Sequence, residues 1–123
     1  MKEEVFMLKM KGYCCSQIIM EMGLGKLGKE NHELVEAMAG LCDGVKCGKI
    51  CGVFSAAICL LYLADGKEAE KGLIHEFTDW FEESFGALDC EDLIGQDTMK
   101  KTQLCPMIVE SSLVKLEELL EWD

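Results

Sequence analysis

Residues 53–64 read VFSAAICLLYLA and form the longest apolar run of the 123-residue chain. Twelve residues are too few to cross a bilayer, and a helix of this composition is apolar nearly all round. The run therefore predicts a buried central helix. We expect that helix to extend from about Lys49 to Ala64 and to stop at Asp65 and Gly66, a frequent C-terminal signal.

Amphipathic helical patterns lie on both sides of this run, whereas alternating strand patterns are scarce. Asn31 suits an N-cap, and Pro106 suits the first turn of the last helix. The sequence predicts an all-α fold, a compact bundle of about five helices in a single domain over residues 1–123. Besides the central helix, helices are predicted over residues 2–10, 13–22, 32–40, 67–85 and 106–121, with one helical turn at 90–95.

The charge of the chain is divided unevenly. Seven lysines balance seven acidic residues in residues 1–64, so the net charge of −11 belongs to residues 65–123. There is no arginine and no basic run, which argues against a nucleic-acid binder. The acidic half is expected to act as a solvated surface or to dock a basic protein partner.

The first residues, MKEEVFMLKMKG, contain acidic side chains at once and no long apolar stretch. This start is unlike a secretory signal, which has a basic end followed by an apolar core. Because no run is long enough for a membrane span, we expect a cytoplasmic protein.

Eight cysteines are a high number for a chain of this length. In a reducing cytosol, metal or redox chemistry explains them better than a disulfide framework. Seven of the eight lie in predicted loops or at predicted helix starts, where backbone N–H groups lower the pKa of a thiol. Cys105 directly precedes the last predicted helix, whereas Cys59 lies within the apolar run and is expected to be a buried, packed side chain.

The densest group of cysteines lies in residues 40–52, GLCDGVKCGKICG. Its spacing, C-x4-C-x3-C, differs by one residue from the plant-type C-x4-C-x2-C run of iron–sulfur proteins. Glycines at every fourth position would let the backbone approach an inorganic cluster, or would form a small-residue face against another helix. No C-x2-C pair is present, which weakens the case for a zinc ribbon or a thioredoxin-type site.

Four segments, GYCCSQ, CGVFSA, CEDLIG and CP, occur in this order within residues 12–107. Together they resemble the C_GCAxxG_C_C family of small proteins described as redox-active. The family pattern G-[FY]-x-C-[AS]-Q matches the first segment, and C-G-A-x-x-G matches the second except that Val53 and Ala56 replace an alanine and a glycine. The resemblance implies that the principal cysteines are Cys15, Cys51, Cys90 and Cys105, with Cys42 and Cys47 as extras.

These four cysteines are distant in sequence, but the starts of several helices can lie at one end of a bundle. Four thiolates gathered there repel one another unless a cation offsets their charge. We therefore expect a metal site made by Cys15, Cys51, Cys90 and Cys105, in which Cys42 or Cys47 can substitute or hold a second site.

Three functions are consistent with this reading. The first is a small redox protein that binds an iron–sulfur cluster or other metal and passes electrons to a redox protein partner. The second is a thiol–disulfide oxidoreductase that uses Cys51 with Cys15 or Cys47 as the resolving cysteine. The third is an interaction module with structural zinc. Whether the chain is an enzyme stays open, as does a homodimer that completes or shields the site.

Other polar residues give weaker signals. His32 and His75 lie among acidic and apolar residues on predicted helices, and the surface position is favoured for His75 over a metal ligand. Ser16 has no base beside it in the sequence, so hydrolase chemistry is unsupported.

Overall fold

The computed structural model describes residues 2–95 and 98–122. Within them the chain is helical apart from turns and one isolated β-bridge, so the predicted all-α fold is confirmed. The described helices exceed the expected number: five have nine or more residues, and shorter segments connect them. In chain order they are α1 (Lys2–Met10), α2 (Cys15–Lys26), α3 (His32–Ala37), η1 (Met38–Leu41), η2 (Gly44–Gly48), α4 (Gly52–Ala64), α5 (Gly66–Glu68), η3 (Ala69–Leu73), α6 (Ile74–Phe85), α7 (Cys90–Leu93) and α8 (Thr98–Leu120).

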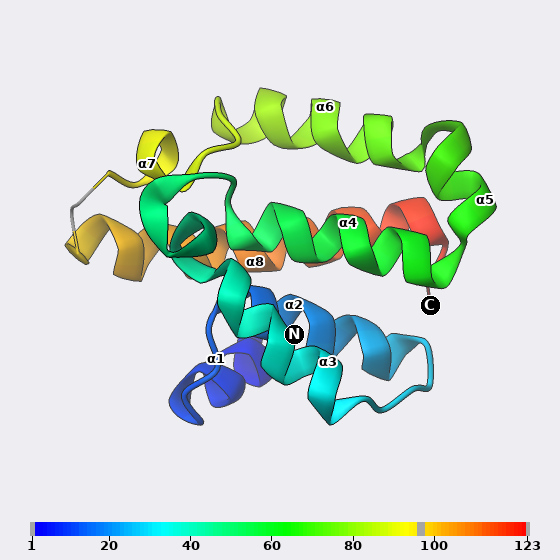
Figure 1. Ribbon diagram of the computed structural model, residues 1–123, viewed down its shortest axis with the longest axis horizontal. Helices are drawn as coiled ribbons and strands as arrows, with labels where there is room; N and C mark the ends of the chain where they lie inside the picture. The colour runs from blue at the N-terminus through cyan, green and yellow to red at the C-terminus, as the bar shows by residue number, and fades with distance from the viewer. Residues whose placement is uncertain (1, 96–97, 123) are drawn as a thin grey trace.

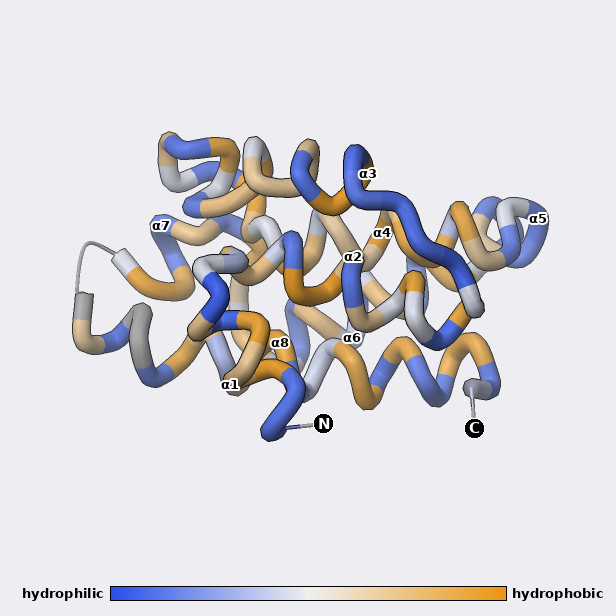
Figure 2. Tube along the Cα trace, turned by 90° about the horizontal axis from the view of Figure 1, so that it is seen from below, coloured by the Kyte–Doolittle hydropathy of each residue, from blue (hydrophilic) through white to orange (hydrophobic). Residues whose placement is uncertain are grey.

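The helices are arranged in three layers (Figure 1). α6 forms one outer layer, α4 and α8 lie against each other in the middle, and α1, α2 and α3 form the other outer layer. The short α7 lies at the end of the bundle where α4 begins, and the connection from α2 to α3 is a hydrophilic outer segment (Figure 2). Across residues 2–95 and 98–122, no helix has the length and apolar character that a membrane crossing requires.

The helix α4 is the central helix, as predicted. Ala56, Ala57, Leu60 and Leu61 are each 0% exposed, and the helix contacts α2, α6 and α8. One side of α4 is nevertheless open to solvent, and the expectation that Cys59 is buried is wrong because it lies on that side. Apolar neighbours in sequence do not bury a residue when no element covers its face of the helix.

The helix α2 ends later than predicted, because it continues through Gly23 to Lys26 and does not stop at residue 22. Glycine inside a helix costs about 1 kcal/mol relative to alanine, and here tertiary packing outweighs that cost. A Cβ atom at Gly23 would collide with the side chain of Leu60, so the glycine lets α2 approach α4 closely.

The start of the last helix was predicted wrongly. Pro106 lies inside α8, which begins at Thr98, and not in its first turn. A proline inside a helix lacks the N–H that would bond the carbonyl four residues earlier. The turn before it is held by packing, because Leu104 and Cys105 both contact the hydrophobic core.

Aromatic side chains pack α6 against α4. Phe77 and Phe81 are 0% exposed, and the Phe54 ring of α4 lies 5.9 Å and 5.4 Å from their respective ring centroids. The Phe85 ring continues this cluster at 4.8 Å from Phe81. These contacts bury the aromatic side of α6, the helix that precedes α7 in the chain.

Ser112 on α8 is a buried polar side chain with a stability cost. It is 0% exposed, and its hydroxyl has no hydrogen-bond partner among the described residues. An unsatisfied buried hydroxyl costs about 1–3 kcal/mol, so we expect Ser112→Ala to raise the free energy of unfolding by about 1 kcal/mol. Urea unfolding of the two proteins measures the difference, and a less stable variant would contradict the prediction.

Candidate functional site

Six of the eight cysteines line one cavity at the end of the bundle. The cavity has a volume of about 260 Å³, which is far more than one water molecule needs. Its wall combines α1, the start of α2, the segment that follows η1, the start of α4, α7 and the middle of α8. The cysteines are Cys14, Cys15, Cys42, Cys51, Cys90 and Cys105, and apolar wall residues include Val5, Ile18, Ile94 and Val109.

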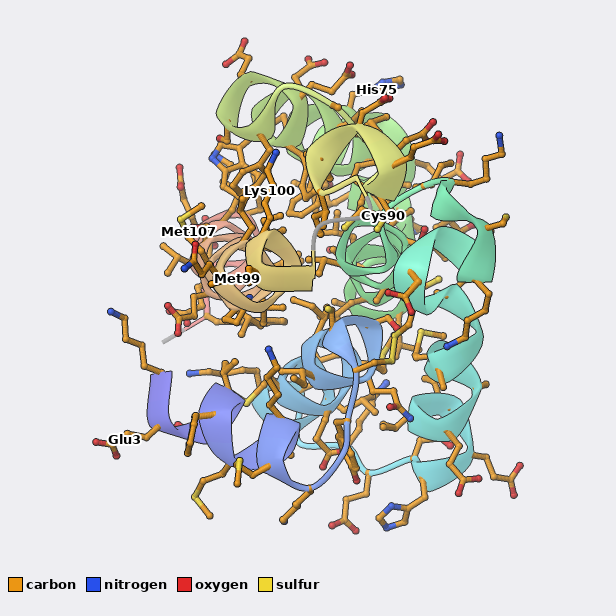
Figure 3. All side chains as sticks on the ribbon, turned by 90° about the vertical axis from the view of Figure 1, so that its left-hand side faces the viewer. Glu3, His75, Cys90, Met99, Lys100 and Met107 are labelled. Atoms are coloured by element: carbon orange, nitrogen blue, oxygen red, sulfur yellow. A yellow bond between two sulfur atoms is a disulfide. The ribbon has the colours of Figure 1, made fainter. Side chains whose placement is uncertain are left out.

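The isolated β-bridge places Cys51 next to Cys90. Ile50 pairs antiparallel with Asp89, the amide of Cys51 donates to the Leu88 carbonyl at 2.8 Å, and the amide of Cys90 donates to the Lys49 carbonyl at 2.7 Å. Alternate residues of extended chain point to opposite sides, so Cys51 and Cys90 share the side opposite Ile50. Figure 3 looks onto this end of the bundle and shows Cys90 at its α7 position. The pairing also explains why α4 begins at Gly52, three residues later than predicted.

Cys15 and Cys105 bring α2 and α8 to the same cavity. Cys15 is the first residue of α2, as expected of a helix-start cysteine, but Cys105 lies in the middle of α8 and not before it. The two thiols are hydrogen-bonded to each other. The four cysteines ranked by the sequence resemblance therefore meet at one cavity, although only three of them occupy helix ends.

Burial controls the protonation of the thiols. It raises the pKa of Cys51 from 9.0 to about 11, and the backbone N–H groups of Phe54 and Val53 offset only part of that rise. For Cys105 the hydrogen bond with Cys15 is the largest cause, followed by burial, and the pKa lies far above its ordinary value. The expectation that a helix start lowers the thiol pKa is therefore wrong for Cys51, because loss of hydration outweighs the helix dipole.

The raised pKa of Cys51 predicts a loss of stability in alkali. In the metal-free protein, folding favours the neutral thiol of Cys51. Its contribution to the free energy of unfolding is therefore fully present below pH 9 and is lost as the pH rises to about 11. A shift of this size corresponds to about 3 kcal/mol. We expect the free energy of unfolding to fall more steeply over this range than in Cys51→Ala, as measured by urea unfolding. If the free energy of unfolding fell equally with pH in the wild type and in Cys51→Ala, the prediction would be wrong.

A disulfide joins Cys14 to Cys42, with their Cα atoms 6.3 Å apart. This single bond was not anticipated from the sequence, which favoured metal or redox chemistry over disulfides for the cysteines. While this bond is intact Cys42 has no thiolate to offer a metal, so its role as a ligand stays a prediction. Cys47, the other extra, is exposed and does not line the cavity, and its thiol donates to the Gly44 carbonyl at 3.5 Å.

A left-handed segment follows the disulfide and borders the cavity. Asp43, Gly44, Val45 and Lys46 all have positive φ, between 51° and 64°. This conformation is strained for a β-branched residue such as Val45, and such strain persists only where the surroundings enforce it. Gly44 meets the backbone of Lys49 so closely that no side chain would fit. Gly44 therefore serves this turn, whose backbone is not the continuous helix that a small-residue face would need.

Ser16 is a candidate functional residue that the sequence did not identify. It is 0% exposed, and its Oγ donates to the Met38 carbonyl at 2.6 Å and lies 2.8 Å from the Sγ of Cys42. The Sγ of Cys14 is 3.6 Å from the same oxygen. Because Met38 and Cys42 are more than twenty residues away in sequence, only the fold brings these atoms together.

The remaining metal-ligand candidates lie elsewhere. His32 and His75 are exposed, so the surface position favoured for His75 is confirmed. Among residues 2–95 and 98–122, no three Cys, His, Asp or Glu side chains are close enough as they stand to hold a single metal ion.

Comparison with known proteins agrees with the cysteine pattern. No curated protein matches the chain, and no solved structure matches it. A family model described as "Putative redox-active protein (C_GCAxxG_C_C)" matches residues 13–119, nearly the whole chain, including all the cysteines of the cavity. The chain therefore belongs to the C_GCAxxG_C_C family of redox-active proteins.

Proposed function

We propose that the cavity binds an iron–sulfur cluster through Cys15, Cys51, Cys90 and Cys105, and that the protein transfers electrons. The observation that carries this proposal is that four thiols from four separate elements line one cavity. Thiolates are the ligands that iron–sulfur clusters use, and such a cluster would supply one-electron redox chemistry here.

The size of the cavity supports a cluster over a single zinc ion. A cavity of about 260 Å³ is large for one ion, and no three described donors already surround such a point. The ligands of a polynuclear cluster are spread over several metal atoms, so they need not converge on one centre. Apolar wall residues such as Ile18 and Val109, each almost fully buried, would keep water away from the guest.

The raised thiol pKa values disfavour Cys51 as a nucleophile. An oxidoreductase needs an accessible thiolate near neutral pH, whereas Cys51 is 6% exposed and has a pKa of about 11. A bound cation reverses this balance, because it stabilises the thiolate and takes the place of the proton.

The acidic surface is the proposed docking face for the electron partner. Glu76, Asp79, Glu82 and Glu83 are exposed on α6, the helix that precedes the α7 wall of the cavity. A basic redox protein would be attracted to this face, and its association rate would fall with added salt.

The test is purification without oxygen, followed by the visible spectrum and by assays of iron, acid-labile sulfide and zinc. A brown protein with iron and sulfide supports the proposal. A colourless protein with stoichiometric zinc would replace it with a structural zinc site. A colourless protein without metal would leave thiol chemistry as the function and would overturn the cluster.

A further inference from the structure

We propose that Cys14–Cys42 is a reducible, redox-active disulfide, and that Ser16 stabilises Cys42 as the leaving thiolate when an external thiol attacks Cys14. The site lies outside the four-thiol set and does not depend on what that set binds. It is carried by the disulfide at the cavity wall and by the position of the Ser16 hydroxyl.

The two cysteines of the bond differ in exposure. Cys14 is half-buried at the N-cap of α2, whereas Cys42 is only 3% exposed. Both line the cavity, so a small thiol reaches Cys14 from there or from solvent. Attack on one sulfur expels the other, and the accessible sulfur is the one that is attacked. Cys42 is therefore the leaving group.

A thiolate formed at Cys42 would be buried and needs a hydrogen-bond donor. In the disulfide neither sulfur carries a proton, so only the Ser16 hydroxyl can donate across the 2.8 Å between Ser16 Oγ and Cys42 Sγ. In the structure the Ser16 hydroxyl donates its single proton to the Met38 carbonyl at 2.6 Å. A charged sulfur is a stronger acceptor than a neutral carbonyl, so the hydroxyl turns toward Cys42 as the bond breaks.

The reaction is a two-electron exchange with a thiol reductant. The attacking thiolate forms a bond to Cys14 Sγ, the Cys14–Cys42 bond breaks, and Cys42 leaves as the thiolate. A second thiol then attacks the external sulfur of the mixed disulfide, which releases Cys14 as a thiolate. The reductant becomes a disulfide, both cysteines are reduced, and solvent protonates them according to the pH. An oxidised dithiol reverses each step.

The first experiment follows the Cys14–Cys42 link in the folded, full-length protein. Dithiothreitol is added without denaturant, samples are quenched with acid and alkylated, and peptide mapping measures the intact link over time. We expect the link to open and to re-form with oxidised dithiothreitol. A link that persists until the chain is unfolded in guanidinium would show a structural cross-link and overturn the proposal.

The second experiment tests Ser16. We expect Ser16→Ala to slow the opening about tenfold, because a hydrogen bond to a charged group is lost. Ser112→Ala is the matched control, since it removes another fully buried hydroxyl that has no hydrogen-bond partner among the described residues, and it should open at the wild-type rate. Equal rates for Ser16→Ala and Ser112→Ala would overturn the leaving-group assignment.

The third experiment needs no variant. Glutathione has one thiol, so the mixed disulfide accumulates and can be located by peptide mapping. An adduct on Cys14 supports the proposed direction of attack, and an adduct on Cys42 overturns it.

Discussion

Replacing Cys105 by serine is expected to remove most of the iron from protein purified without oxygen. Cys105 is buried in the cavity wall and hydrogen-bonded to Cys15, so its substitution removes one of the four proposed ligands from the cavity. Loss even of groups that only support a metal ligand costs about 10–100-fold in affinity, and loss of a ligand should cost at least as much. Iron and sulfide per chain, with the visible spectrum, measure the effect.

The control for this substitution is Cys59→Ser. Cys59 is exposed on α4 and does not line the cavity, so the variant should keep the iron content of the wild type. Cys90→Ser should behave like Cys105→Ser, and helical circular dichroism verifies that each variant is folded. Retention of iron by both Cys90→Ser and Cys105→Ser would exclude them as ligands.

Phe81→Ala is expected to lower the free energy of unfolding by about 3–5 kcal/mol, because it removes a fully buried ring and leaves a cavity. The ring contacts Phe54 on α4 and also Phe77 and Phe85 along α6. A domain of this size is stable by only about 5–15 kcal/mol, so the loss is a large fraction of the total. The midpoint of urea unfolding should fall accordingly.

Phe6→Ala provides a matched comparison. The Phe6 side chain is 62% exposed on α1, so the same change in volume should alter stability by no more than about 0.5 kcal/mol. If both variants lost similar stability, α6 would not be packed against α4 by its aromatic residues.

The apolar periodicity predicted the helices well, since it reports which face of each helix is buried. The central position of α4 and the buried face of α6 follow directly from their sequences. The errors at Gly23 and Pro106 have a common cause, because each residue was judged by its local helix propensity. In the fold, Leu60 packs against Gly23, and core contacts hold the turn before Pro106.

The four cysteines ranked by the short motifs all line one cavity, together with Cys14 and Cys42, but the motifs contain no information on pairing. The contact of Cys51 with the segment around Cys90 depends on two hydrogen bonds between backbone segments about forty residues apart. The Cys14–Cys42 bond and the Ser16 contact likewise depend on where η1 lies over the start of α2. These contacts between distant residues are established only when the helices pack together.

The position of Cys105 on the last helix has a consequence for biosynthesis. A chain leaves the ribosome from its N-terminus, and early domains or helices can fold while the rest is still being made. Here the start of α2 emerges well before α8, which contributes part of the cavity wall. The complete wall of the cavity can therefore form only once the segment that carries Cys105 has left the ribosome.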